Sequence, residues 1–110
     1  MKLPDFEQAI IRGEKLEKYL LNTSHPDGAS KARFFMQRGF STESPVDLKT
    51  ALLEHAMQGE LVEEIPNQFG TKYVLKGFLQ CPDGTSPLVR SIWIIENGKN
   101  IPELITAYPL

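Results

Sequence analysis

The feature that most constrains this fold is a change in the spacing of apolar residues close to Gly59. Before Gly59, apolar residues recur at helical spacing, and after it they alternate with polar residues, as they do in a strand. A block of helices followed by a block of strands is typical of an α+β domain. We therefore predict two or three N-terminal helices packed on a C-terminal four-stranded, mainly antiparallel sheet.

Breakers and capping residues give approximate boundaries for these elements. Three helical segments are predicted: one around Leu16, Tyr19 and Leu20, one from about Ala29 to Arg38, and one that begins at Pro45 and is ended by Gly59. Four strands are predicted, at Glu60–Ile65, Lys72–Gln80, Leu88–Glu96 and Leu104–Tyr108. Turns at Cys81-Pro82-Asp83-Gly84 and Asn97-Gly98 would join the later strands as hairpins.

Length and composition indicate one ordinary globular domain over residues 1–110. Hydrophobic residues make up 41% of the chain and charged residues 24%, which argues against disorder. No apolar run is long enough to cross a membrane, and the first residues lack the apolar core of a signal peptide. The single cysteine, Cys81, excludes an internal disulfide and fits the reducing cytoplasm, where we expect the protein to be located.

Charge is unevenly distributed along the chain. The net charge of −2 argues against broad attraction to nucleic acid. Residues 25–42 nevertheless carry three basic side chains against one acid, whereas residues 43–64 carry six acids against one lysine. A locally basic face and an acidic face are therefore both expected, although an ordinary solvated surface would have the same composition.

The strongest candidate site is the turn from His25 to Gly28 and the basic helix that follows it. A loop histidine such as His25 can exchange a proton near neutral pH, although a surface histidine that only shapes the turn before Pro26 is the more ordinary interpretation of the residue taken alone. The start of a helix, at Gly28 and Ser30, presents free N–H groups to an anion. Lys31 and Arg33 are suited to stabilising a phosphate.

Three residues of the last two strands extend this candidate site. Arg90 lies on a strand that otherwise looks buried, so it either lines a groove or forms an ion pair with an acid on the neighbouring strand. Thr106 and Tyr108 alternate onto one face of the last strand, and their hydroxyls would hold phosphate oxygens or cap the sheet edge. The second histidine, His55, is predicted to be structural, at the flank of the third helix.

Other chemistries fit poorly. Two histidines thirty residues apart and one cysteine do not have the spacing of a metal site. Cys81 has no adjacent base to activate it as a nucleophile, and no glycine-rich phosphate loop is present. We therefore expect neither a metal nor a cofactor.

Four segments resemble a small bacterial domain family of unknown function, whose members stand alone or form the C-terminal modules of toxin-like proteins. The resemblance covers about residues 10 to 109. The segments are Glu14-Lys15-Leu16 with Tyr19-Leu20-Leu21-Asn22, His25-Pro26-x-Gly28-x-x-Lys31-Ala32-Arg33-Phe34-Phe35, Val89-Arg90-Ser91-Ile92-Trp93 and Thr106-Ala107-Tyr108-Pro109.

More distantly, the order of helices and sheet is similar to that of the barnase, EndoU, colicin and RelE group of ribonuclease toxins. This resemblance implies a metal-independent endoribonuclease that acts through the ribose 2′-hydroxyl. His25 would then be a general acid or base, Lys31 and Arg90 would stabilise the phosphorane, and Thr106 would position a phosphate oxygen. The net acidic charge and the single well-placed histidine depart from that pattern.

The residues leave three functions open. The first is this ribonuclease, with RNA as substrate and a small inhibitor protein as a partner. The second is a non-catalytic interaction protein, an immunity or regulatory partner that uses the acidic segment from Glu43 to Glu64. The third is a protein that binds a small anion at the helix start near Gly28 without any reaction.

Overall fold

The computed structural model describes residues 1–110 and contains an α+β fold, as the sequence predicts. The N-terminal half holds short turns η1 (Phe6–Gln8), α1 (Gly13–Lys15) and η2 (Leu16–Leu20), followed by α2 (Ala29–Gln37) and α3 (Pro45–Gln58). The C-terminal half holds strands β1 (Glu60–Pro66), β2 (Gly70–Phe78), β3 (Leu88–Glu96) and β4 (Glu103–Pro109). No helix is long and apolar enough to cross a membrane.

The four strands form an antiparallel meander in the order β1-β2-β3-β4. The turns predicted from the sequence lie in the connections: the Gly84 N–H donates to the Cys81 carbonyl at 3.0 Å, and Gly98 has a φ of 78°. The one parallel contact is a bridge between Ile10 and Glu103, which fastens the N-terminal segment to the start of β4. In the order β1-β2-β3-β4, strands β2 and β3 are internal, and β1 is an edge strand.

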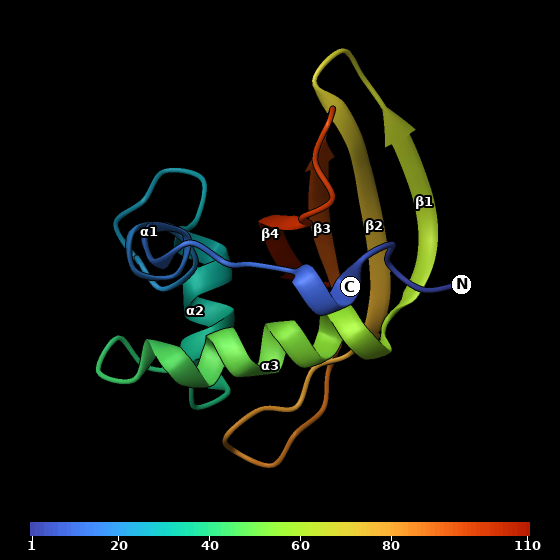
Figure 1. Cartoon of the computed structure of the whole chain (residues 1–110). Helices are drawn as coiled ribbons and strands as arrows, with labels where there is room; N and C mark the ends of the chain where they lie inside the picture. Colours follow the sequence, from blue (N-terminus) through green and yellow to red (C-terminus); the bar gives the residue numbers. More distant parts are fainter.

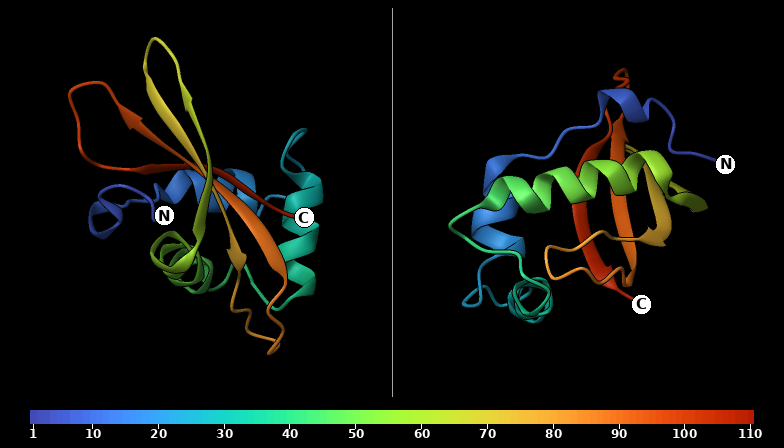
Figure 2. Two further views of the ribbon diagram at one scale, coloured as in Figure 1. Left: turned by 90° about the vertical axis from the view of Figure 1, so that its right-hand side faces the viewer. Right: turned by 90° about the horizontal axis from the view of Figure 1, so that it is seen from below.

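The two longer helices cover one face and one edge of the sheet (Figures 1 and 2). Helix α3 lies across one face, and α2 packs against η2 and β4 at the other end of the strand order from β1. The core between α3 and the sheet is closed by Trp93, Leu75, Leu52 and Leu48, each 0% exposed. Alternation along β3 then turns Arg90 and its neighbours at even positions away from α3.

A buried hydrogen-bond chain joins α3 to the sheet. His55 is 2% exposed, and its Nε2 lies 3.1 Å from the Gly77 carbonyl oxygen and 3.0 Å from that of Val89. Its Nδ1 lies 2.8 Å from the Ser91 hydroxyl, which also accepts the Trp93 indole N–H at 2.8 Å. Two carbonyls at Nε2 require its hydrogen there, so neutral His55 accepts from Ser91 at Nδ1. His55 is thus structural in this fold.

Burial lowers the pKa of His55 below its ordinary value, against the opposing effect of the two carbonyls. Below about pH 6.5 the His55 imidazole is protonated in the unfolded chain but stays neutral in the folded chain. The free energy of unfolding therefore falls as pH falls, by up to about 1.4 kcal/mol per pH unit. We expect His55→Gln to remove this part of the slope in urea unfolding at a series of pH values. The same substitution at His25 should leave the His55 contribution in place, and an unchanged slope in His55→Gln would contradict the assignment.

Strand β2 begins at Gly70, where the backbone of β3 leaves no room for a side chain. A Cβ there would meet the Ile95 carbonyl oxygen and would lie 2.8 Å from the Glu96 Cα, both atoms of the β3 backbone. We expect Gly70→Ala to lower the free energy of unfolding by about 1–3 kcal/mol, measured by urea titration. Gly13→Ala is the matched control, because a Cβ added there would meet nothing within 4 Å and alanine favours a helix start. Equal effects of the two substitutions would argue against this packing.

Candidate functional site

Three of the four residues predicted to be catalytic surround the side chain of Tyr19. They are His25, Lys31 and Thr106. The Tyr19 hydroxyl lies 3.1 Å from the Thr106 Oγ1 on β4. The His25 ring meets the Tyr19 ring edge to face, with 4.9 Å between centroids, and the Lys31 Nζ lies 5.3 Å from the same ring centroid. Tyr19 thus links the loop, α2 and the last strand in one polar cluster.

The position of Tyr19 follows from how η2 is wound. The Leu21 N–H donates to the Leu16 carbonyl at 2.8 Å, which closes a single turn of π-helix, a feature frequent at functional sites. Leu16 and Leu20 enter the core, and Tyr19 is left half-buried. Lys15, one turn earlier, places its Nζ 5.0 Å from the Tyr19 ring centroid. The phenol therefore has two ammonium groups beside it.

The His25 loop is held by the imidazole itself. His25 Nδ1 accepts the backbone N–H groups of Asp27 and Gly28, both at 3.0 Å, and the Lys31 Nζ donates to the Asp27 carbonyl at 3.1 Å. A Cβ on Gly28 would lie 2.9 Å from the Tyr19 ring, so only glycine allows this approach. The Gly28 amide is engaged by His25 in this conformation, and anion binding by that amide stays a prediction.

The surroundings of Tyr19 lower the pKa of its phenol. Partial burial alone raises the pKa of the phenol, but interactions with Lys31 and Thr106, and the positive charges of Lys31 and Lys15, lower it below its ordinary value. Beside the phenol is an open hollow of about 500 Å³, lined by Arg12, Glu14, Lys15, Lys18, Tyr19, His25 and Glu103. Of these, Arg12 is paired with Glu103 at 3.1 Å.

The fourth predicted catalytic residue, Arg90, lies on the same sheet face as Thr106 but does not join the Tyr19 cluster. Arg90 pairs with Tyr108 across β3 and β4, and Ile92 pairs with Thr106, so Arg90 and Thr106 are diagonal neighbours. The Arg90 Nε is buried and has no hydrogen-bond partner.

The ion pair that the sequence offers as an alternative for Arg90 is wrong. Its cross-strand neighbours are Lys76 on β2 and Tyr108 on β4, and neither is an acid. Arg90 takes part in no ion pair, so its positive charge is uncompensated. The uncovered face of β3 can therefore accept an anion.

Two other predicted binding residues lie apart from the cluster. Arg33 is exposed and follows Lys31 by two helical positions, about 200° around α2, so it points away from Tyr19. Ser30 lies in the first turn of α2, and its side chain makes no hydrogen bond within the chain. A role for either residue in binding RNA stays a prediction.

Sequence reasoning missed Tyr19 as a site residue and assigned it to the apolar face of its helix. The available signal was Lys15 four positions before it, since residues at that spacing share a helix face. No group of three or more His, Cys, Asp or Glu side chains is placed to hold a metal ion.

Comparison with known proteins places this geometry in a wider context. No curated protein matches the chain. One solved structure with the same fold is described as a contact-dependent growth inhibition toxin–immunity protein complex from Klebsiella pneumoniae 342; the matching chain has a TM-score of 0.71 and 14% identity, over 96% of each chain. At this identity the similarity shows the fold alone. The family described as "Domain of unknown function (DUF6883)" matches residues 2–110, and the chain belongs to that family.

Proposed function

We propose that this domain is a metal-independent endoribonuclease that cleaves cytoplasmic RNA through attack of a ribose 2′-hydroxyl on the adjacent phosphate. The observation that carries the proposal is the cluster of Tyr19, His25, Lys31 and Thr106, with Arg90 on the same sheet face as Thr106. The fold shared with a chain of a toxin–immunity protein complex supports a role in such a system, either as the toxin or as the immunity protein.

The cations Lys31 and Arg90 would stabilise the negative charge that develops in this reaction. As the 2′-oxygen bonds to phosphorus, negative charge gathers on the phosphoryl oxygens, and preorganised donors stabilise it. Lys31, from α2, lies beside the Tyr19 ring whose hydroxyl contacts Thr106, and Arg90, from β3, is a diagonal neighbour of Thr106. The Thr106 hydroxyl and the Nε2–H of His25 are the hydrogen-bond donors that would position the phosphate oxygens.

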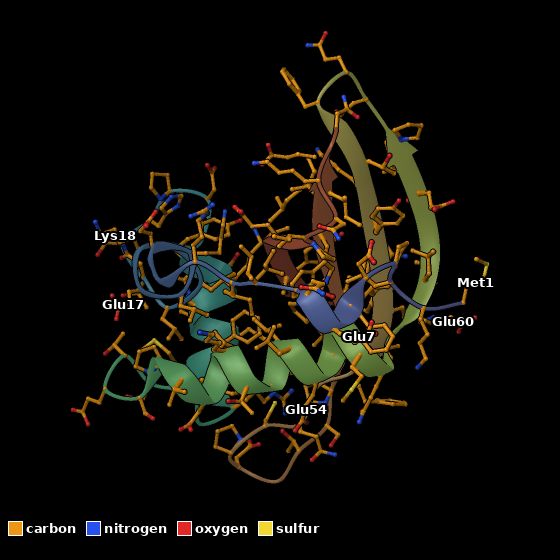
Figure 3. The ribbon with its side chains drawn as sticks, in the orientation of Figure 1. Met1, Glu7, Glu17, Lys18, Glu54 and Glu60 are labelled. Carbon is orange, nitrogen blue, oxygen red and sulfur yellow. The ribbon has the colours of Figure 1, made fainter.

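Charge segregation makes RNA binding compatible with the net charge of −2. The acids between residues 43 and 64 lie on or beside α3 and β1, whereas the cations of the hollow lie around α1 and η2. Figure 3 shows Glu54 and Glu60 projecting near α3 and the start of β1, well away from Lys18 beside α1. An RNA chain that approaches the hollow therefore meets a local excess of positive charge.

A second candidate, a non-catalytic interaction module, has its own supporting observation. Strand β1 is an edge, and six of its seven residues are exposed, among them Val62 at 46% and Ile65 at 40%. Exposed apolar residues on an edge strand are suited to pairing with another chain. A small inhibitor protein or a toxin partner would fit there.

The first test is cleavage of total RNA and transfer RNA by purified protein in excess EDTA. We expect products that end in a 2′,3′-cyclic phosphate and begin with a 5′-hydroxyl, resolved on gels and by end-group analysis. Lys31→Ala should slow cleavage by about 10²–10³-fold, because one preorganised charge is lost. Lys99→Ala, which removes an exposed lysine paired with Glu96, is the charge-matched control and should cleave as the wild type does.

Intact RNA after incubation with folded wild-type protein would overturn this function. Pull-down with strand-presenting partners would then test the interaction module. Phosphate titration followed by NMR would test the small-anion binder, which predicts binding near Gly28 without any cleavage.

Arg90 gives a second test of the same function. We expect Arg90→Ala to weaken RNA binding and slow cleavage by at least about 10-fold, since a half-buried cation proposed to contact the substrate phosphate is lost. Arg90→Lys should recover only part of the effect, because lysine cannot bind a phosphate through two parallel donors. Fluorescence anisotropy with a short labelled RNA measures binding; equal affinity in all three proteins would remove Arg90 from the site.

A further inference from the structure

The imidazole of His25 is poorly placed to accept a proton. Its Nδ1 accepts two backbone N–H groups, so neutral His25 carries its hydrogen on Nε2. The open nitrogen is then a donor. For Nε2 to accept a proton from substrate, the hydrogen would first have to move to Nδ1, where it would face the N–H groups of Asp27 and Gly28. The histidine therefore suits hydrogen bonding to a phosphate oxygen, and another group is needed as the base.

Tyr19 is the remaining candidate in the cluster. Its hydroxyl lies 3.1 Å from the Thr106 Oγ1, and its side chain lines the open hollow. Lys15 and Lys31 place ammonium groups 5.0 Å and 5.3 Å from its ring centroid, from α1 and from α2. Two cations beside one phenol stabilise its phenolate form and so lower the pKa of Tyr19.

We propose that the Tyr19 phenolate accepts the proton of the attacking 2′-hydroxyl; this inference rests on the proposed function. The 2′-oxygen bonds to phosphorus as its proton passes to the Tyr19 oxygen, and the bond from phosphorus to the 5′-oxygen breaks. The departing 5′-oxygen takes a proton from the Lys31 ammonium. Transfer of the phenol proton to the Lys31 amine then restores the starting state, and the products are a 2′,3′-cyclic phosphate and a 5′-hydroxyl.

The charged surroundings of the phenol are consistent with this role. The lowered pKa of Tyr19 brings it closer to the pH range in which a general base works well. Its ionisable and charged neighbours are Lys31 from α2, His25 from the loop, Glu103 from β4, and Arg12, Glu14, Lys15 and Lys18 from the segment around α1 and η2. Arg12 and Glu103 offset each other as an ion pair, and the remaining basic groups outnumber Glu14.

A spectroscopic titration tests the inference without RNA. The chain has three tyrosines, and tyrosinate formation is followed by near-ultraviolet absorbance across an alkaline pH series. We expect the component that ionises at the lowest pH to vanish in Tyr19→Phe, to persist in Tyr73→Phe, and to move to higher pH in Lys31→Met. Persistence of that component in folded Tyr19→Phe would overturn the inference whether or not RNA is cleaved.

Single-turnover cleavage over a pH series tests the catalytic role. We expect Tyr19→Phe, which keeps the ring against Gly28 and His25, to lower the rate by about 10²–10⁴-fold and to remove the rise of rate with pH. His25→Gln should be slower than the wild type but keep that rise. Should Tyr19→Phe fail to fold, Lys15→Met provides the measurement: it removes one cation beside the phenol but no group that transfers a proton, so the rise of rate should move to higher pH.

The failures of the two proposals are distinguishable. No cleavage by the wild type would overturn the proposed function, and the absorbance titration would still decide whether Tyr19 is the readily ionised tyrosine. Cleavage by the wild type with a Tyr19→Phe rate within a few-fold of it would overturn the role of Tyr19 alone. In that case His25 would be the base after a change of tautomer, and His25→Gln would remove the rise of rate with pH.

Discussion

The hydrogen bonds of His55 determine how the helical half of this protein is joined to the sheet. The Trp93 indole N–H donates to the Ser91 hydroxyl, and the Ser91 hydroxyl donates to His55 Nδ1. The hydrogen on His55 Nε2 is shared by carbonyl oxygens of β2 and β3. All of these side chains are buried, so a shift of α3 along the sheet would leave several polar groups without partners in an apolar interior. A unique placement of α3 follows.

That placement also determines which residues face the candidate site. Because Ser91 and Trp93 must point toward α3, Arg90 and Ile92 must point the other way, and a slip of one residue would exchange the two sets. The register shift near Trp93 adds a residue to β4 and leaves Thr106 opposite Ile92, on the face of Arg90. The packing of Ser91 and Trp93 against α3 therefore determines that Arg90 and Thr106 lie on the opposite face of the sheet.

The sequence predicted the elements well and the contacts of the site poorly. The boundaries of β3 match the prediction, because alternation and the flanking breakers act locally. The role of Tyr19 was missed since its partner Thr106 lies 87 positions away and a turn of π-helix alters the helical spacing. The surroundings of Arg90 depend on strand register, which one strand does not encode. The capping of Nδ1 in His25 depends on loop geometry, which residue types alone do not determine.

The unpaired cations are what distinguishes this site from an ordinary surface. Lys15 and Lys31 approach one phenol ring, and Arg90 lies opposite Lys76, although like charges at such spacing disfavour the folded state. The chain has more acidic than basic residues, so acids were available to neutralise these positions. Local conflicts of this kind concentrate where a protein binds or reacts. In the proposed function, an RNA phosphate held beside Thr106 would be stabilised by both sets of cations, by Lys31 from α2 and by Arg90 from the same sheet face as Thr106.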